Sequence, residues 1–167
     1  MSLYRDSLSC PLGRVDVYVD STGSLVRIDL CDADAPPSQS AASGRPATER
    51  CRAAITQLGE YFAGARRDFD LPLRPQGTSF QQAAWQQLQR IPYGSTISYA
   101  EEAARLGRPT AYRAVGGANG KNPLPIVIPC HRVIAADGSL GGFSAGLAKK
   151  QWLLDHEQSQ LQRRGRA

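Results

Sequence analysis

The residues with the clearest chemical potential end a short apolar segment, as Pro129-Cys130-His131-Arg132. A thiol becomes a strong nucleophile only after it loses its proton, and a neighbouring imidazole or cation can lower its pKa. An imidazole and a guanidinium directly follow Cys130, so the segment predicts a nucleophilic cysteine with a lowered pKa. The alternative is a buried, inert thiol beside an ordinary core histidine, which is the commoner situation for a Cys-His pair.

A carboxylate near the end of the chain adds a third group. The helix predicted from about Gly146 has an apolar side, and Glu157 lies one turn beyond its last two leucines. The leucines of that side are Leu147, Leu153 and Leu154. We expect Glu157 to be partly buried there and to need a partner, and an imidazole suits because the carboxylate orients it and stabilises its charged form. The predicted nucleophile, base and orienting group are Cys130, His131 and Glu157, with a water bridging the first two.

Residues 1–75 are predicted to form a small α+β lobe. Apolar and polar residues alternate over 15–19 and 26–30 around a polar turn, which predicts a β-hairpin. A loop rich in Pro, Ser and Ala covers 33–47. Apolar residues then recur at helical spacing until Gly64 ends the helix. Alternation resumes at the end of the lobe and predicts a further strand over 69–73.

Residues 76–160 are predicted to form a mostly helical lobe with a helix-turn-helix, followed by a basic tail over 161–167. Ser79 and Ser98 each begin a capping-box pattern, with a Gln or Glu three residues later, and so mark two helix starts. Pro109 suits the first turn of a third helix.

The second and third of these helices resemble a DNA-binding helix-turn-helix, although most such pairs are simply packed helices. The later helix holds Arg113 among small residues, which let a helix backbone approach a partner closely. The small residues are Ala111, Ala114, Gly116, Gly117 and Ala118. Tight packing against other helices explains them equally well, so both interpretations stay open at this point.

The composition favours a globular protein with an acidic partner. The formal net charge of +5 agrees with binding to nucleic acid, although charge alone does not establish it. The arginines of the tail are expected to be solvated and to add attraction to phosphate. The sequence shows neither an apolar run long enough to span a bilayer nor a signal-peptide core. We therefore expect an intracellular, cytoplasmic protein without membrane contact, at the nucleoid if bacterial.

The cysteine pattern argues against a disulfide framework and against a metal site. The cysteines are scattered, as is usual for thiols in a reducing compartment. They are Cys10, Cys31, Cys51 and Cys130. A zinc site requires a Cys-x-x-Cys pair or nearby histidines, but the histidines, His131 and His156, lie far from the first three cysteines. We expect no metal and no organic cofactor.

The second lobe closely resembles the O6-alkylguanine-DNA alkyltransferases, also called methylated-DNA–protein-cysteine methyltransferases. The resemblance covers about 78–157 motif by motif, whereas the first lobe agrees in size and element order. Its motifs are Arg113-Ala114-Val115-Gly116, Asn122-Pro123, Pro129-Cys130-His131-Arg132-Val133, Gly142-Phe143-Ser144 and Trp152-Leu153-Leu154-Asp155-His156-Glu157. It implies DNA repair by a single, irreversible transfer of an alkyl group from O6-alkylguanine in double-stranded DNA. It also implies a monomer, with cooperative assembly on DNA left open.

The resemblance further implies catalytic roles at the matching positions. Cys130 accepts the alkyl group, and His131 activates the thiol through a water. Glu157 orients His131, and Asn122 braces the turn beside the site.

The residues that contact DNA or substrate follow from the same resemblance. Arg113 enters the base stack in place of the flipped nucleotide, and Tyr99 helps to rotate that nucleotide. Flipping is physically required because a buried thiolate cannot reach the O6 atom of a stacked guanine. The other expected contacts are Ala114, Gly116, Pro125, Arg132, Val133, Phe143 and Ser144.

Two positions depart from the family pattern. Phe143 stands where the family usually has tyrosine, so a hydroxyl contact is lost while the ring still walls the pocket. Tyr112 replaces a small residue on the recognition helix and alters the contact with the groove.

Two other functions compete with this interpretation. A lesion-binding protein would keep the helix-turn-helix and the pocket but would not transfer the alkyl group. A cysteine hydrolase would use Cys130 and His131 with many turnovers and without DNA.

Overall fold

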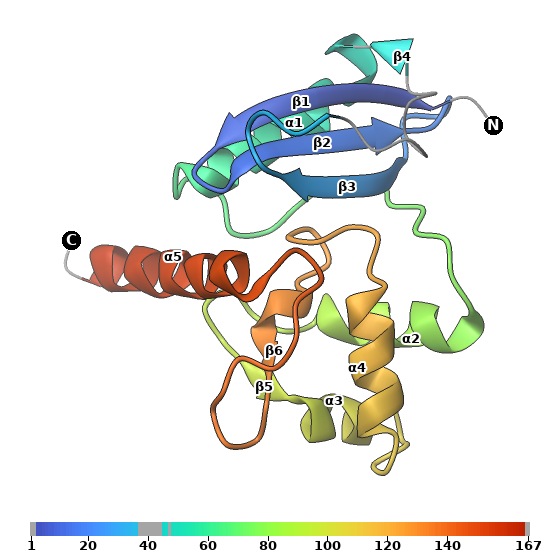
Figure 1. Cartoon of the computed structure of the whole chain (residues 1–167), viewed down its shortest axis with the longest axis vertical. Helices are drawn as coiled ribbons and strands as arrows, with labels where there is room; N and C mark the ends of the chain where they lie inside the picture. Colours follow the sequence, from blue (N-terminus) through green and yellow to red (C-terminus); the bar gives the residue numbers. More distant parts are fainter. Residues whose placement is uncertain (1–2, 37–44, 47, 166–167) are drawn as a thin grey trace. The chain divides into compact units, whose positions relative to one another are not determined.

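The computed structural model describes residues 3–36, 45–46 and 48–165. The chain divides into two compact units, Met1–Gln76 and Gly77–Ala167. Most of the strands belong to the first unit and most of the helices to the second, as Figure 1 shows. The expected α+β class is confirmed.

The first unit is built on a four-stranded sheet in the order β3-β2-β1-β4. Its strands are β1 (Tyr4–Cys10), β2 (Gly13–Val19), β3 (Leu25–Cys31) and β4 (Arg45–Pro46). The first three are antiparallel neighbours, and β4 runs parallel to β1. The hairpin expected from the alternating residues is β2 with β3 and is confirmed. Strand β1 was not expected, because none of its side chains is fully buried and its apolar alternation is weak.

Helix α1 (Thr48–Phe62) packs on β1 and β2 and confirms the helix expected before Gly64. Of the loop expected over 33–47, two residues form β4, and residues 37–44 and 47 lie outside the described part of the chain.

The prediction of a strand over 69–73 is wrong. Only Leu73 forms a bridge, with Leu25, whose backbone N–H donates to Pro72 O. Arg74 N in turn donates to Leu25 O. A ladder cannot extend through Pro72, because proline has no N–H to donate.

The second unit contains the helices that position the segment around Cys130. They are α2 (Ser79–Leu88), α3 (Tyr99–Arg105), α4 (Tyr112–Gly120) and α5 (Leu147–Gly165). Short parallel strands β5 (Ile97–Ser98) and β6 (Val133–Ile134) pair with each other, and one turn of 3-10 helix, η2, covers Cys130–Arg132. Helix α4 packs against both α2 and α3 (Figure 1).

Both expected capping sites mark helix starts, one of them displaced by a residue. Thr78, not Ser79, caps α2: its hydroxyl accepts from Gln81 N, and the Gln81 side chain accepts from Thr78 N. Ser98 caps α3 as expected and accepts from Glu101 N.

Helix α4 begins later than expected. Pro109 lies in the connection from α3, and Tyr112 is the first helical residue. Ala111 N donates to Arg108 O, which closes a separate turn around Pro109 before the helix starts.

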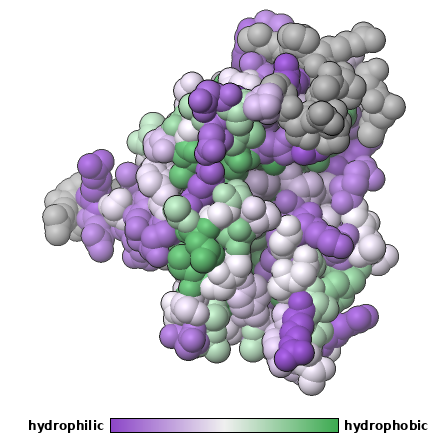
Figure 2. Space-filling model, in the orientation of Figure 1, coloured by the Kyte–Doolittle hydropathy of each residue, from purple (hydrophilic) through white to green (hydrophobic). Residues whose placement is uncertain are grey.

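Helix α5 is longer than expected. It continues through Gly165, so residues 161–165 of the expected tail are helical, and residues 166–167 lie outside the described chain. Figure 2 shows mostly hydrophilic residues along its C-terminal half. Leu153 is fully buried, but Leu147, the first residue of the helix, is 49% exposed and does not belong to the apolar side. Within the described residues, none of the helices has the length and apolar character needed to cross a membrane.

Candidate active site

A tight turn presents Cys130 at the end of the apolar segment. Pro129 has φ −82° and ψ 65°, and Cys130 N donates to Ile128 O at 2.8 Å, which is the geometry of an inverse γ-turn. Cys130 then begins η2 and is 8% exposed. It lines a cavity of about 550 Å³. The thiol is therefore buried in the protein and accessible from a pocket.

Asn122 holds the segment that precedes Cys130. Its Nδ2 donates to Ile128 O at 2.7 Å, and Leu124 N donates to its Oδ1 at 2.9 Å. Between these bonds Ile126 has φ 76°, a left-handed conformation that is unfavourable for a β-branched residue. The hydrogen bonds of Asn122 thus maintain a strained turn beside the thiol.

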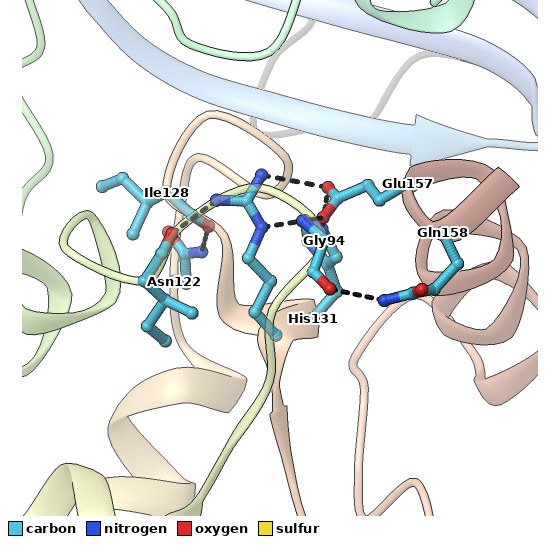
Figure 3. A network of polar contacts seen from close by, with 8 residues as sticks. Gly94, Asn122, Ile128, His131, Glu157 and Gln158 are labelled. Atoms are coloured by element: carbon cyan, nitrogen blue, oxygen red, sulfur yellow. Dashed lines mark hydrogen bonds and ion pairs between the residues drawn. The ribbon is translucent and has the colours of Figure 1, made fainter. Parts of the chain in front are cut away.

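His131 and Glu157 point toward each other from η2 and α5 (Figure 3). His131 Nε2 lies 2.7 Å from Glu157 Oε2, and both side chains are buried. The carboxylate also accepts from Gly94 N at 3.0 Å, from Arg132 Nε at 2.9 Å and from Arg132 Nη2 at 3.0 Å. Burial opposes ionisation, but the bonds to His131 and Arg132 outweigh it and hold the pKa of Glu157 well below its usual range.

The hydrogen bond to Glu157 decides which nitrogen of His131 carries the proton. An ionised carboxylate only accepts, so Nε2 is the protonated nitrogen of the neutral ring and Nδ1 has a free lone pair. Nδ1 is buried and has no hydrogen-bond partner among the described residues. Burial lowers the pKa of His131, and the pairing with Glu157 only partly offsets it. His131 is therefore neutral in the resting protein, mainly because it is buried, and the expected stabilisation of its charged form by Glu157 belongs to a later step.

The expected lowering of the Cys130 pKa is wrong. Burial raises the pKa of Cys130 to about 11, although the hydrogen bond to Asn122 and the charge of Lys150 lower it. The imidazole of His131 is neutral and the guanidinium of Arg132 is engaged with Glu157, so neither can stabilise a thiolate in the resting state. Cys130 is a protonated thiol until a base accepts its proton.

Arg132, expected to contact the substrate, is not among the described residues that line the cavity. It is 5% exposed, and its Nη1 donates to Ile91 O at 2.8 Å while Nε and Nη2 bind Glu157. A guanidinium held in this way supplies the fixed cation that a buried carboxylate needs.

Lys150 is a site residue that the sequence did not indicate. It is fully buried in α5, and its Nζ donates to Val133 O at 2.7 Å, to Gly142 O at 3.0 Å and to Leu140 O. The ammonium also lies 5.8 Å from the centre of the Tyr99 ring. Lys150 therefore attaches the loop after β6 to α5. In the sequence it is the second of two adjacent lysines, a pattern typical of a solvated helix face.

Tyr99 begins α3 and forms one wall of the same cavity. Its hydroxyl accepts from Gly142 N at 3.3 Å. Gly141 has φ 70°, and a Cβ placed on it would lie 2.6 Å from the Tyr99 hydroxyl. This position requires glycine both for its backbone conformation and for the close approach.

The cavity brings together six of the expected site residues. They are Tyr99, Arg113, Gly116, Cys130, Phe143 and Ser144. The other lining residues are Tyr112, Asn119, Gly120 and Gly142. Of the remaining expected contacts, Ala114 is exposed on α4, Pro125 is partly buried, and Val133 is fully buried with its carbonyl bound to Lys150.

The cysteines are not paired with one another, as expected. The described residues contain no group of three or more His, Cys, Asp or Glu side chains that could hold a metal ion.

Two family models match the chain. The DNA binding domain of 6-O-methylguanine DNA methyltransferase matches residues 79–159, and the ribonuclease-like domain of the same family matches residues 3–75. The chain belongs to the 6-O-methylguanine DNA methyltransferase family.

Individual relatives agree with this family. A methylated-DNA–protein-cysteine methyltransferase from Methanosarcina barkeri is 52% identical over 110 residues, which are 66% of this chain and 70% of that protein. A protein of the same name from Mycobacterium leprae is 41% identical over 155 residues, 93% of this chain and 92% of that one. A crystal structure of Mycobacterium tuberculosis OGT in complex with DNA aligns with a TM-score of 0.85 and 38% identity over 94% of each chain. The chain is thus a DNA-binding repair enzyme that acts by alkyl transfer to cysteine.

In this methyltransferase, Gly116 and Gly117 of α4 are not required for packing among the described residues. The helix buries Val115, Ala118 and Asn119. A Cβ on Gly116 would lie 3.8 Å from the Tyr99 ring, an ordinary contact, and one on Gly117 would meet no described atom within 4 Å. The glycines therefore leave a face of the helix backbone exposed, which favours close approach of a partner over tight helix packing.

Proposed function

We propose that the protein removes the alkyl group from the O6 atom of a guanine in double-stranded DNA and that Cys130 is the acceptor. The observation that carries this proposal is the position of Cys130, which lines a cavity of about 550 Å³ and directly precedes a buried, neutral imidazole. Its thiol has a pKa of about 11. Such a thiol reacts at neutral pH only when a neighbouring base takes its proton.

The proposed reaction begins with proton transfer from the thiol to His131 Nδ1, directly or through one water. Nε2–H remains hydrogen-bonded to Glu157, whose charge stabilises the imidazolium that forms. The thiolate attacks the alkyl carbon, the carbon–O6 bond breaks, and the guanine recovers a proton from the imidazolium or from solvent. A thioether does not hydrolyse readily, so each molecule repairs one lesion.

DNA would contact the exposed face of α4. Arg113 is exposed there and also lines the cavity, so its guanidinium can replace a nucleotide that has moved from the stack into the pocket. Tyr99, Phe143 and Ser144 line the space that the base would enter. We further propose that the protein acts in the cell compartment that holds the chromosomal DNA. It would act there as a monomer and without a bound cofactor.

Intact-protein mass spectrometry after mixing with duplex DNA containing O6-methylguanine tests the proposal. The parent protein should gain one methyl group per molecule and then stop. Cys130→Ala should gain none and should still bind the lesion. Cys51→Ala is the matched control, because Cys51 is another buried thiol with a pKa of about 11, and this variant should react like the parent.

Each competing function predicts a different result in this experiment. Methyl transfer by Cys130→Ala onto another cysteine would contradict the assignment of the acceptor. A lesion-binding protein would bind the duplex without any mass increase. A cysteine hydrolase would turn over an ester many times in the absence of DNA.

A further inference from the structure

Glu102 and Asn119 form a buried polar pair that the proposed reaction does not use. Glu102, in α3, is fully buried, and Asn119, in α4, is 7% exposed. Asn119 Nδ2 donates to Glu102 Oε2 at 2.8 Å. The pair links the two helices of the helix-turn-helix, and Asn119 also lines the cavity beside Cys130.

Each partner of this pair leaves one buried oxygen without a hydrogen bond from the described residues. These atoms are Glu102 Oε1 and Asn119 Oδ1. An ionised carboxylate and an amide oxygen are both acceptors, so neither can satisfy the other. A protonated carboxyl group has an O–H donor, and a proton on Oε1 would supply a second hydrogen bond within the same pair. One proton thus satisfies both oxygens, whereas ionisation leaves both desolvated and unsatisfied.

Among the described helices and strands that pack against α3, none offers Glu102 a cation to balance a negative charge. Strands β5 and β6 and helix α2 pack against α3 and contain no titratable residue. The titratable residues of α4, Tyr112 and Arg113, are exposed. The groups whose ionisation is coupled to Glu102 are Tyr99 and Cys130, which are neutral or negative.

A comparison with Glu157 shows what a buried carboxylate needs in order to stay ionised. Glu157 is as deeply buried but has Arg132 and His131 as partners, and its pKa falls. Burial raises the pKa of Glu102 to about 7, and the hydrogen bond from Asn119 offsets only part of this rise.

We propose that Glu102 exchanges a proton near neutral pH and that the protonated carboxylic acid donates from Oε1 to Asn119 Oδ1. Two hydrogen bonds then hold the Asn119 amide in the wall of the pocket, and Glu102 is a positioning residue that acts through Asn119. The inference rests on the proposed function only in assigning this pocket to the alkylated base. Ionisation of Glu102 breaks the second hydrogen bond and places a negative charge where it opposes formation of the Cys130 thiolate.

A raised pKa has a defined consequence for stability. The folded protein retains the Glu102 proton at pH values where the unfolded chain has lost it. The contribution of Glu102 to stability is therefore present below the ordinary pKa of 4.5 and is lost as the pH rises to about 7.

Glu102→Gln tests this inference because glutamine preserves both hydrogen bonds without a titratable proton. Its Nε2 can donate to Asn119 Oδ1, and its oxygen can accept from Asn119 Nδ2. We expect Glu102→Gln to match the Tm of the parent below about pH 4.5 and to exceed it by a margin that grows until about pH 7 and then levels off. Glu101→Gln, at an exposed position of the same helix, is the control and should not show a margin that grows with pH.

Carbon NMR of the glutamate carboxyl groups in the parent protein gives a direct measurement that needs no variant. The Glu102 signal should titrate with a midpoint near 7. A midpoint at or below 4.5, or a Tm difference for Glu102→Gln that does not change with pH, would overturn the protonation of Glu102 near neutral pH.

Neither measurement involves alkyl transfer, so both remain valid if Cys130 is not the acceptor. The link to the pocket is tested by the transfer rate on methylated duplex DNA between pH 6 and 8. Glu102→Gln should equal the parent at pH 6 and exceed it by about twofold to tenfold at pH 8, the effect of a pKa change of up to about one unit on the thiolate fraction. Identical pH profiles would overturn the role of Glu102 in positioning Asn119 and in controlling Cys130.

Discussion

In the proposed reaction, Cys130 becomes reactive through a base, because the pKa of its thiol is raised in the resting protein. Burial keeps His131 uncharged, and Arg132 contributes by placing a positive charge on the far side of Glu157 through two hydrogen bonds. A neutral imidazole can accept a proton from the thiol, whereas an imidazolium cannot. The carboxylate then stabilises the charge on His131 only once the reaction has begun.

Glu157→Gln should slow alkyl transfer and destabilise the fold. The variant weakens the partner of an imidazolium and removes the counter-charge of a buried guanidinium. Breaking a buried pair of this kind typically costs about 3–5 kcal/mol. Transfer rates on methylated duplex DNA and denaturant unfolding at pH 7 measure the two effects. Glu101→Gln, which weakens only a solvent-exposed ion pair with Arg105, should change both far less.

The same variant should change how stability depends on pH. The pKa of Glu157 is depressed in the folded state, so its contribution is present above the ordinary pKa of 4.5 and is lost as the pH falls below it. The stability difference between Glu157→Gln and the parent should therefore shrink toward acid pH. A difference that is constant down to pH 3 would show that the pairing does not depend on an ionised carboxylate.

The sequence predicted some of these residues and not others, for physical reasons. Cys130 and His131 are adjacent to each other in the chain, and Glu157 lies one turn beyond the buried Leu153 on α5, so local spacing was sufficient. The inward orientation of Arg132 depends on a carboxylate 25 residues away. Glu102 belongs to an acidic pair in the first turn of α3, which is usual at an exposed helix start and hides its burial.

At the scale of elements, the sequence predicted the helices and missed weakly patterned strands. Helix starts carry local chemistry, so Ser98 was placed correctly and the α2 cap was missed by a residue. Strand β1 shows little apolar alternation that could reveal it in the sequence. It is held as a strand by its pairing with β2, which the local sequence does not show. The segment 69–73 has the alternation of apolar and polar residues that is typical of a strand. It does not form one because Pro72 lacks the backbone N–H that a strand needs for pairing.

Gly117→Ala should stabilise the protein and weaken its binding to DNA. Alanine is about 0.5–1 kcal/mol more favourable than glycine inside a helix, and no described atom lies within 4 Å of the new methyl group. The methyl group would nevertheless occupy the face of α4 that we assign to DNA. Unfolding free energy and affinity for duplex DNA measure the two effects.

Gly59→Ala provides a matched control. Gly59 is also helical, its added Cβ would lie 4.0 Å from the Leu8 side chain, and it belongs to the ribonuclease-like domain. It should give a similar gain in stability without a change in DNA affinity. If Gly117→Ala bound DNA as tightly as the parent, the exposed face of α4 would not be the DNA interface.

For the whole molecule, the sequence predicts a boundary between two lobes at residues 75 and 76. Along the chain, the two compact units of the structure are divided between Gln76 and Gly77. The change from alternating to helical periodicity occurs at this point in the chain. The end of the molecule was less predictable, because α5 continues into a polar segment whose apolar periodicity is weak.

The basic end of the chain should add affinity for DNA without adding specificity for the lesion. It carries Arg163, Arg164 and Arg166, and replacing all three by glutamine lowers the formal net charge by three, from +5 to +2. Each phosphate contact contributes about 0.9 to the slope of log K against log salt concentration, because binding releases condensed counterions. The triple variant should therefore bind both methylated and unmodified duplexes more weakly at low salt, with a slope reduced by up to about 2.7. The ratio of the two affinities should not change, since phosphate contacts carry no information about the base.

Affinities measured by fluorescence anisotropy at several salt concentrations test this. An unchanged slope would show that these arginines make no phosphate contact, and an altered ratio would place at least one of them at the lesion itself.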